Sequence, residues 1–109
     1  MEPGEPLLVL RTSTTFWSRL RGLYGLTPMS DHHGMFISPC KAIHTLGMRC
    51  RIDVVFVDSH LRELKRVDSL CANRFAACLA ATAVIELPAG YCRRHSDYLC
   101  RIRHALARE

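Results

Sequence analysis

The sequence lacks the features of a membrane-spanning, exported or zinc-knuckle protein. No apolar run approaches the roughly 20 residues that span a bilayer. The first residues, MEPGEPLLVLR, are acidic where a signal peptide would be basic. No Cys-x-x-Cys pair occurs, so the usual redox and zinc-knuckle motifs have no support. We therefore expect a cytoplasmic protein without a membrane span, whose six cysteines stay reduced.

The chain has little lysine, because 13 of its 15 basic residues are arginine. Its net charge of +5 lies in residues 41–109, whereas residues 1–40 are neutral overall. A basic half attracts anions, but the sequence contains no motif that reads nucleic acid. We expect no specific nucleic-acid binding. The length of 109 residues fits a single domain, 1–109, with residues 1–6 as a loose leader.

Short apolar segments predict a β-rich fold. The segment 52–57, IDVVFV, is nearly all apolar, which predicts a strand covered on both faces. The segment 61–70 alternates loosely and predicts a hairpin partner for it. Three more strands are expected over 7–11, 34–38 and 82–87.

Helical signals are fewer. N-cap candidates and an apolar stripe predict one N-terminal helix over 14–24. The segment 71–83 is compatible with a helix or with a loop and a short helix, and the tail 98–106 with a closing strand or a basic helix. The predicted fold class is a small α+β domain with a mostly antiparallel, barrel-like sheet.

The stretch CKAIHTLGMRCRID gathers ligand-type side chains at Cys40, His44 and Met48. Their order resembles a blue-copper loop, but the second histidine of such a site should come from a distant strand. His32 and His33 lie too close in sequence to supply it, so we expect no metal and no cofactor. Direct Cys40–His44 catalysis would require a bend, because extended residues four apart are about 13 Å from each other.

Two carboxylates interrupt or begin apolar strands. Asp53 opens the segment 52–57, and Glu86 lies inside TAVIEL. If they face each other, they could form the acid/base pair of a hydrolase. The simpler interpretation is that Asp53 caps a turn or accepts backbone N–H bonds. Glu86 would then pair with an arginine such as Arg19, Arg49 or Arg51. We therefore assign no catalytic residue.

Three phrases in this order resemble the domain of unknown function 192 family. They are RLRGLYG, GMFISPCKAIHTLGMRCRIDVVFVD and VIELPAG, and the resemblance covers roughly residues 7–103. The family's ending differs here, because Ser96-Asp97 stands where a Gly-Asp pair is usual. The positions that match the family's motifs include Arg19, His44, Met48, Asp53 and Glu86.

The resemblance implies a compact bacterial β-rich domain with no established reaction or cofactor. Together with the residues, it favours a non-enzymatic binding or accessory module with a shallow groove near His44–Met48. The candidate groove residues are Arg19, His44, Met48, Asp53 and Glu86. The alternative is a small hydrolase that uses Asp53 and Glu86. Expected partners are a small molecule or a protein, with envelope or pilus-assembly components suggested by the family's gene companions.

Overall fold

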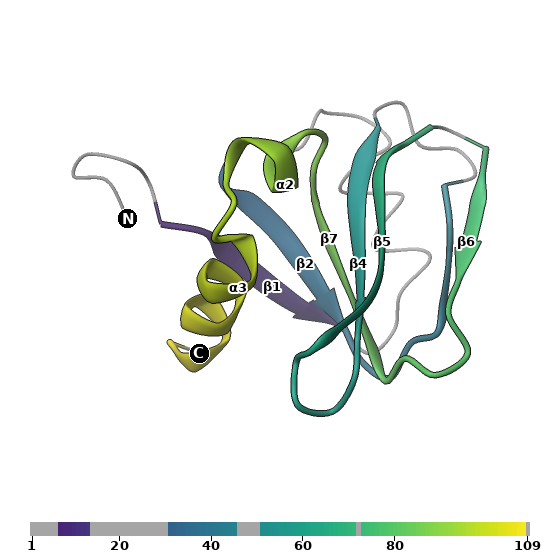
Figure 1. Ribbon diagram of the computed structural model, residues 1–109, viewed down its shortest axis with the longest axis horizontal. Coiled ribbons are helices and arrows are strands. Elements are labelled where there is room, and N and C mark those ends of the chain that lie inside the picture. The colour runs from purple at the N-terminus through teal and green to yellow at the C-terminus, as the bar shows by residue number, and fades with distance from the viewer. Residues whose placement is uncertain (1–6, 14–30, 46–50, 72, 109) are drawn as a thin grey trace.

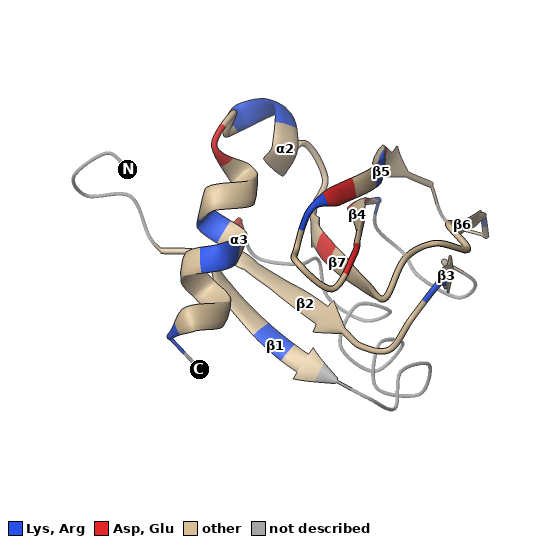
Figure 2. Ribbon diagram, turned by 60° about the horizontal axis from the view of Figure 1, so that its bottom comes forward, with Lys and Arg blue, Asp and Glu red and all other residues tan. Residues whose placement is uncertain are grey.

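The computed structural model describes residues 7–13, 31–45, 51–71 and 73–108. These residues form two sheets and two short helices (Figure 1). Helix α3 lies beside β1 at one end of the larger sheet (Figure 1 and Figure 2), α2 contacts the central strand β7, and β6 lies beyond β5 at the other end. The elements in chain order are β1 (Val9–Ser13), β2 (His33–Ile37), β3 (Ala42–His44), β4 (Ile52–Val57), β5 (Glu63–Leu70), β6 (Phe75–Ala77), β7 (Ala83–Pro88), α2 (Tyr91–Arg94) and α3 (Tyr98–Ala107).

The larger sheet has five strands in the order β1-β2-β7-β4-β5. Strands β1 and β2 are parallel, and every other neighbouring pair is antiparallel. The last strand of the chain, β7, therefore lies in the centre. Strands β3 and β6 form a separate antiparallel pair.

Both faces of the large sheet are covered. The helix face is the side packed against α2 and α3, and it includes Leu10, Val55, Ile85 and Leu87. The β3–β6 face is the opposite side, where residues of β2, β4 and β7 pack with Ile43 and Ala76. Because both faces are covered, every residue of β4 and β7 is buried. This explains why both strands are almost wholly apolar.

A glycine allows β2 and β7 to approach closely. A Cβ atom on Gly34 would lie 2.4 Å from the carbonyl oxygen of Glu86 and 2.9 Å from Cδ2 of Leu10. The first of these is a backbone atom, which cannot move aside without disturbing the sheet. Glycine is therefore required at this position for the β2–β7 pairing.

Most predicted strands are confirmed. Strand β4 has the predicted bounds and is buried on both faces, and β5 pairs with it antiparallel. Strands β1, β2 and β7 match the predicted segments within two residues at each end. In the segment 71–83, however, the structure has the strand β6 where a helix or loop was expected. The tail forms the helix α3, which was one of its two predicted forms.

The predicted fold class is wrong in two respects. In the described part of the chain the sheet is open and mixed, with β1 and β5 as its edges, and it does not close into a barrel. The described helices also lie at the C-terminal end, whereas the predicted helix was N-terminal. Its range, 14–24, lies outside the described residues. Neither α2 nor α3 has the length and apolar character that crossing a membrane requires.

Candidate functional site

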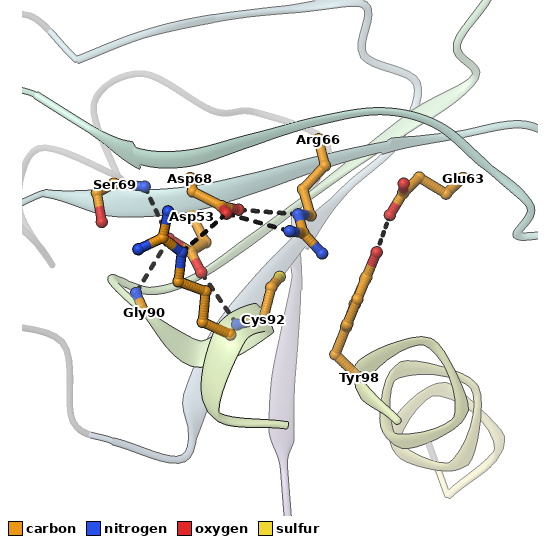
Figure 3. Close-up of polar contacts among 9 residues, drawn as sticks. Asp53, Glu63, Arg66, Asp68, Ser69, Gly90, Cys92 and Tyr98 are labelled. Atoms are coloured by element: carbon orange, nitrogen blue, oxygen red, sulfur yellow. Dashed lines mark hydrogen bonds and ion pairs between the residues drawn. The ribbon is translucent and has the colours of Figure 1, made fainter. Parts of the chain in front are cut away.

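Asp53 is a fully buried carboxylate on the helix face of the sheet. It lies in β4 opposite Leu87 of β7, and the neighbouring side chains Val55 and Leu87 belong to the helix face. One oxygen accepts N–H bonds from Ser69 (2.8 Å) and Gly90 (3.1 Å). The other accepts the N–H of Cys92 at 3.0 Å (Figure 3). The prediction that Asp53 is held by backbone N–H groups is confirmed.

Two of these donors have a left-handed backbone. Ser69 has φ 51° near the end of β5, and Gly90 has φ 84° in the turn between β7 and α2. The carboxylate of Asp53 thus joins its own strand, β4, to an irregular part of β5 and to the start of α2. With three donors satisfied, the arrangement is that of a structural anchor.

A possible ligand set surrounds this anchor. One carboxylate oxygen each of Asp53 and Asp68 and the Sγ of Cys92 lie within 4.8 Å of one another. Burial, together with the smaller effect of the nearby Asp53 charge, raises the pKa of Cys92 to about 12, so the thiol is neutral near pH 7. A neutral thiol is a poor metal ligand, because the thiolate is the form that binds metals.

Two arginines already neutralise Asp68. The Nε of Arg66 lies 2.9 Å from Oδ1 (Figure 3), and the Nε of Arg93 lies 3.7 Å from Oδ2. A cation at this cluster would have to displace both guanidinium groups. The donor chemistry therefore fits an ion-pair network better than a metal centre.

The same network reaches α3. The guanidinium of Arg66 lies over the ring of Tyr98 at 5.3 Å, and the Tyr98 hydroxyl donates to Glu63 (Figure 3). Strand β5 is thereby tied to α3 by a cation–π contact and a hydrogen bond. Sequence reasoning missed Arg66, Asp68, Cys92 and Tyr98, because only the folded chain brings β5 beside α2 and α3.

Glu86 is the second fully buried carboxyl, and it lies on the β3–β6 face. In the strand register it is opposite Met35 of β2 and Val54 of β4, and both of those side chains belong to that face. Among the described residues, neither of its carboxyl oxygens has a hydrogen-bond partner. Burial raises the pKa of Glu86 from 4.5 to about 8.

The described residues around Glu86 are apolar apart from a thiol. The charge of Glu86 contributes to a raised pKa at Cys40, for which burial is the larger cause. The Cys40 thiol itself donates to the carbonyl oxygen of Ala42 at 3.1 Å. No described arginine pairs with Glu86, so the predicted pairing is wrong for Arg51. The other two candidates, Arg19 and Arg49, lie outside the described residues.

Asp53 and Glu86 do not share a site. The sheet lies between their carboxyl groups, because Asp53 points to the helix face and Glu86 to the β3–β6 face. A hydrolytic pair needs both carboxyls on one substrate. The geometry therefore gives no support to a hydrolase built on these two acids.

The other predicted groove residues are only partly placed. The backbone of His44 pairs with Phe75 in the β3–β6 pair, while Arg19 and Met48 lie outside the described residues. The next residue, Thr45, is buried and accepts the Arg74 N–H at 2.8 Å. A groove near His44–Met48 stays a prediction.

Taken as a class, the chain is a small β-rich domain with an open mixed sheet and C-terminal helices. It belongs to the DUF192 family, described as an uncharacterized ACR, which matches residues 3–96. This confirms the resemblance seen in the sequence. None of the curated proteins matches the chain.

Two crystal structures have a similar fold. One is a protein of unknown function from Novosphingobium aromaticivorans, with 18% identity and a TM-score of 0.66, over 78% of this chain and 66% of that one. The other is described as a putative transcription regulator from Sinorhizobium meliloti, with 18% identity and a TM-score of 0.69, over 80% of this chain and 73% of that one. The chain thus spans slightly less than two thirds of the first structure.

Proposed function

We propose that this chain is a non-enzymatic binding module whose ligand reaches Glu86 on the β3–β6 face of the sheet. The observation that carries the proposal is the pairing state of this carboxyl. Glu86 is fully buried, and neither oxygen has a described hydrogen-bond partner. Leaving a buried polar group unpaired costs about 1–3 kcal/mol. A ligand that supplies the missing donor would offset that cost.

The chemistry of the described residues supports binding over catalysis. Asp53 is occupied by three N–H donors, and the Cys92 thiol is neutral near pH 7. A nucleophilic thiol needs an activating base or a lowered pKa, and the pKa of Cys92 is raised. Glu86 can bind a donor, but no other described carboxyl belongs to its face to share acid/base work.

Full burial also predicts how binding proceeds. Glu86 has an exposed fraction of 0%, so a ligand reaches it only after a local opening of the protein. We expect association to be slower than at a preformed site, because binding that requires a conformational change has a lower association rate constant.

The test is a fragment screen by NMR and thermal shift with amines, amides, alcohols and carboxylic acids. We expect donor-bearing fragments to shift the amide resonances of β2, β4 and β7 and to raise Tm. The Glu86→Leu variant, which has no acceptor at this position, should lose this response, while Asp31→Asn, which changes an exposed acid, should keep it. If no fragment affects these strands, or if folded Glu86→Leu responds like the parent, the proposal fails.

A cytoplasmic site of action is part of the proposal. The five described cysteines are free thiols, and such thiols suit a reducing compartment. An unknown small molecule or protein, including envelope or pilus-assembly components, remains the proposed partner. Fractionation of the native host with an antibody to this chain checks the compartment, and recovery in the periplasm would contradict it.

A further inference from the structure

We infer that the ligand of Glu86 is an organic cation, an amine or guanidinium on an apolar body, which takes the place of the carboxyl proton. The inference rests on the proposed function and specifies its ligand class. Two observations carry it, which are the missing donors at Glu86 and the apolar character of the face around it.

Asp53, in the same sheet, shows how a buried carboxylate is satisfied by hydrogen-bond donors of the protein itself. Asp53 has the same exposed fraction as Glu86, 0%, and it receives three backbone N–H bonds. Glu86 lies one strand away and receives none from the described residues. An ammonium or guanidinium group supplies several donors together with a positive charge. Such charge-assisted bonds are roughly twice as strong as neutral ones.

The surroundings define the rest of the ligand. Glu86 is flanked in register by Met35 and Val54 and along its strand by Val84, all three fully or almost fully buried. A ligand with further polar groups would leave them unpaired against these side chains. We therefore expect a single cationic group on an alkyl or aryl body.

Proton exchange follows from the chemistry of the pair. With a pKa of about 8, Glu86 is mostly protonated at pH 7. A cation R–NH₃⁺ that binds the ionised carboxylate displaces the Glu86 proton into solvent, so total charge is conserved. The affinity for the cation should then increase about tenfold for each unit by which the pH is raised towards 8, and it should level off above pH 8.

The other groups that could titrate near this face are few. Among the described residues, the thiols of Cys40 and Cys78 pack against it, and Lys65 lies at its edge, 5.9 Å over the Phe56 ring. The Cys40 pKa is raised, so this thiol stays neutral from pH 6 to 8. Lys65 donates to the carbonyl oxygen of Ala77, which holds its ammonium group at β6.

The experiment uses isosteric probes, n-hexylammonium and n-hexylguanidinium against n-hexanol and hexanoate. Calorimetry at pH 6, 7 and 8, in buffers of different ionisation enthalpy, measures affinity and proton release together. We expect the cations to bind the parent about tenfold more tightly at pH 7 than at pH 6, with release of about one proton. Proton release in the parent does not depend on any variant folding.

Three variants sharpen the result. Glu86→Gln should weaken cation binding at pH 8 at least tenfold and abolish proton release, whereas Asp31→Asn should behave like the parent. Equal binding of hexanol without proton release, lost in Glu86→Leu, would overturn the cation class but keep a binding function. Donor fragments that act through Glu86 while neither cation binds would do the same. Cation binding undiminished in Glu86→Gln would also overturn the inference.

Discussion

Asp53 and Glu86 lie on adjacent strands with the same complete burial, yet they point to opposite faces of one sheet. Asp53 receives three N–H bonds, and Glu86 receives none from the described residues. Two acids that look alike in the sequence therefore have different roles. Asp53 holds β4, β5 and the start of α2 together, and Glu86 is the candidate for ligand binding.

Replacing Asp53 should lower the free energy of unfolding. Asp53→Ala leaves three N–H groups, one in a buried and two in partly buried hydrogen bonds, without their acceptor, and each such loss costs about 1–3 kcal/mol. We expect a loss of at least about 3 kcal/mol in the free energy of unfolding, measured by urea denaturation. Asp31→Ala, which removes an exposed acid, is the control and should change little. A parent-like midpoint for Asp53→Ala would contradict the anchoring role.

Two donors to Asp53, Gly90 and Ser69, have a left-handed backbone. Stability should fall when the glycine at 90 is replaced, and it should not fall when a glycine is introduced at 69. Gly90→Ala places a Cβ on a residue with φ 84° and should cost about 1–2 kcal/mol. Ser69→Gly removes a Cβ at φ 51° and should be neutral or stabilising by up to about 1 kcal/mol. Thermal melting of both variants beside the parent checks the signs. A stabilised Gly90→Ala would show that the turn adopts another backbone in solution.

The pH dependence of stability should carry the signature of Glu86. Its pKa in the folded protein is about 8, above the ordinary 4.5, so its contribution is fully present below pH 4.5 and is lost as pH rises to 8. Glu86→Gln cannot ionise. Its stability relative to the parent should therefore increase by about 1.4 kcal/mol per pH unit within that window.

Urea unfolding of both proteins at pH 5, 6.5 and 8 measures this difference. Asp31→Asn serves as the control, and its difference from the parent should not follow the same curve. A Glu86→Gln difference that stays constant from pH 5 to 8 would mean that Glu86 is ionised throughout, with a partner that compensates its burial.

Thiol reactivity should separate the cysteines by burial. Cys100 is exposed on α3, whereas Cys92 is buried with a pKa of about 12. Because the thiolate is the reactive form, iodoacetamide at pH 8 should modify Cys92 at least about a hundredfold more slowly than Cys100. Peptide mass spectrometry over time gives both rates. The difference should vanish in urea, and equal rates in the folded protein would contradict the burial of Cys92.

The sequence predicted the strands well, because β4 and β7 are short apolar segments bounded by polar residues or turns, and β5 is a loosely alternating segment that follows β4 after a turn. It did not predict on which face each acid lies. Side chains alternate along a strand, but β4 and β7 are apolar on both faces, so their pattern does not distinguish one side from the other. The separation of Asp53 from Glu86 depends on the pairing register between strands, which is a tertiary property.

The errors have similar causes. Alanine-rich 71–83 favoured a helix by propensity, but Phe75–Ala77 pairs with β3, and tertiary pairing overrides weak propensity. A barrel was expected from the number of strands alone. Whether a sheet closes depends on its edges, and no local pattern indicated that β1 would pair parallel to β2. The anchor around Asp53 was foreseen in kind, but its three donors were not.

The central position of β7 has a consequence for how the chain folds. During synthesis β2 and β4 are both made before β7, the strand that lies between them. Until β7 is available, each of them has an unpaired apolar edge, and such edges promote aggregation. The sheet can be completed only after residues 83–88 have emerged, through contacts between distant parts of the chain. Nascent chains that stop before Ala83 should therefore depend on chaperones, whereas the full chain can pair the inner edges of β2 and β4 with β7.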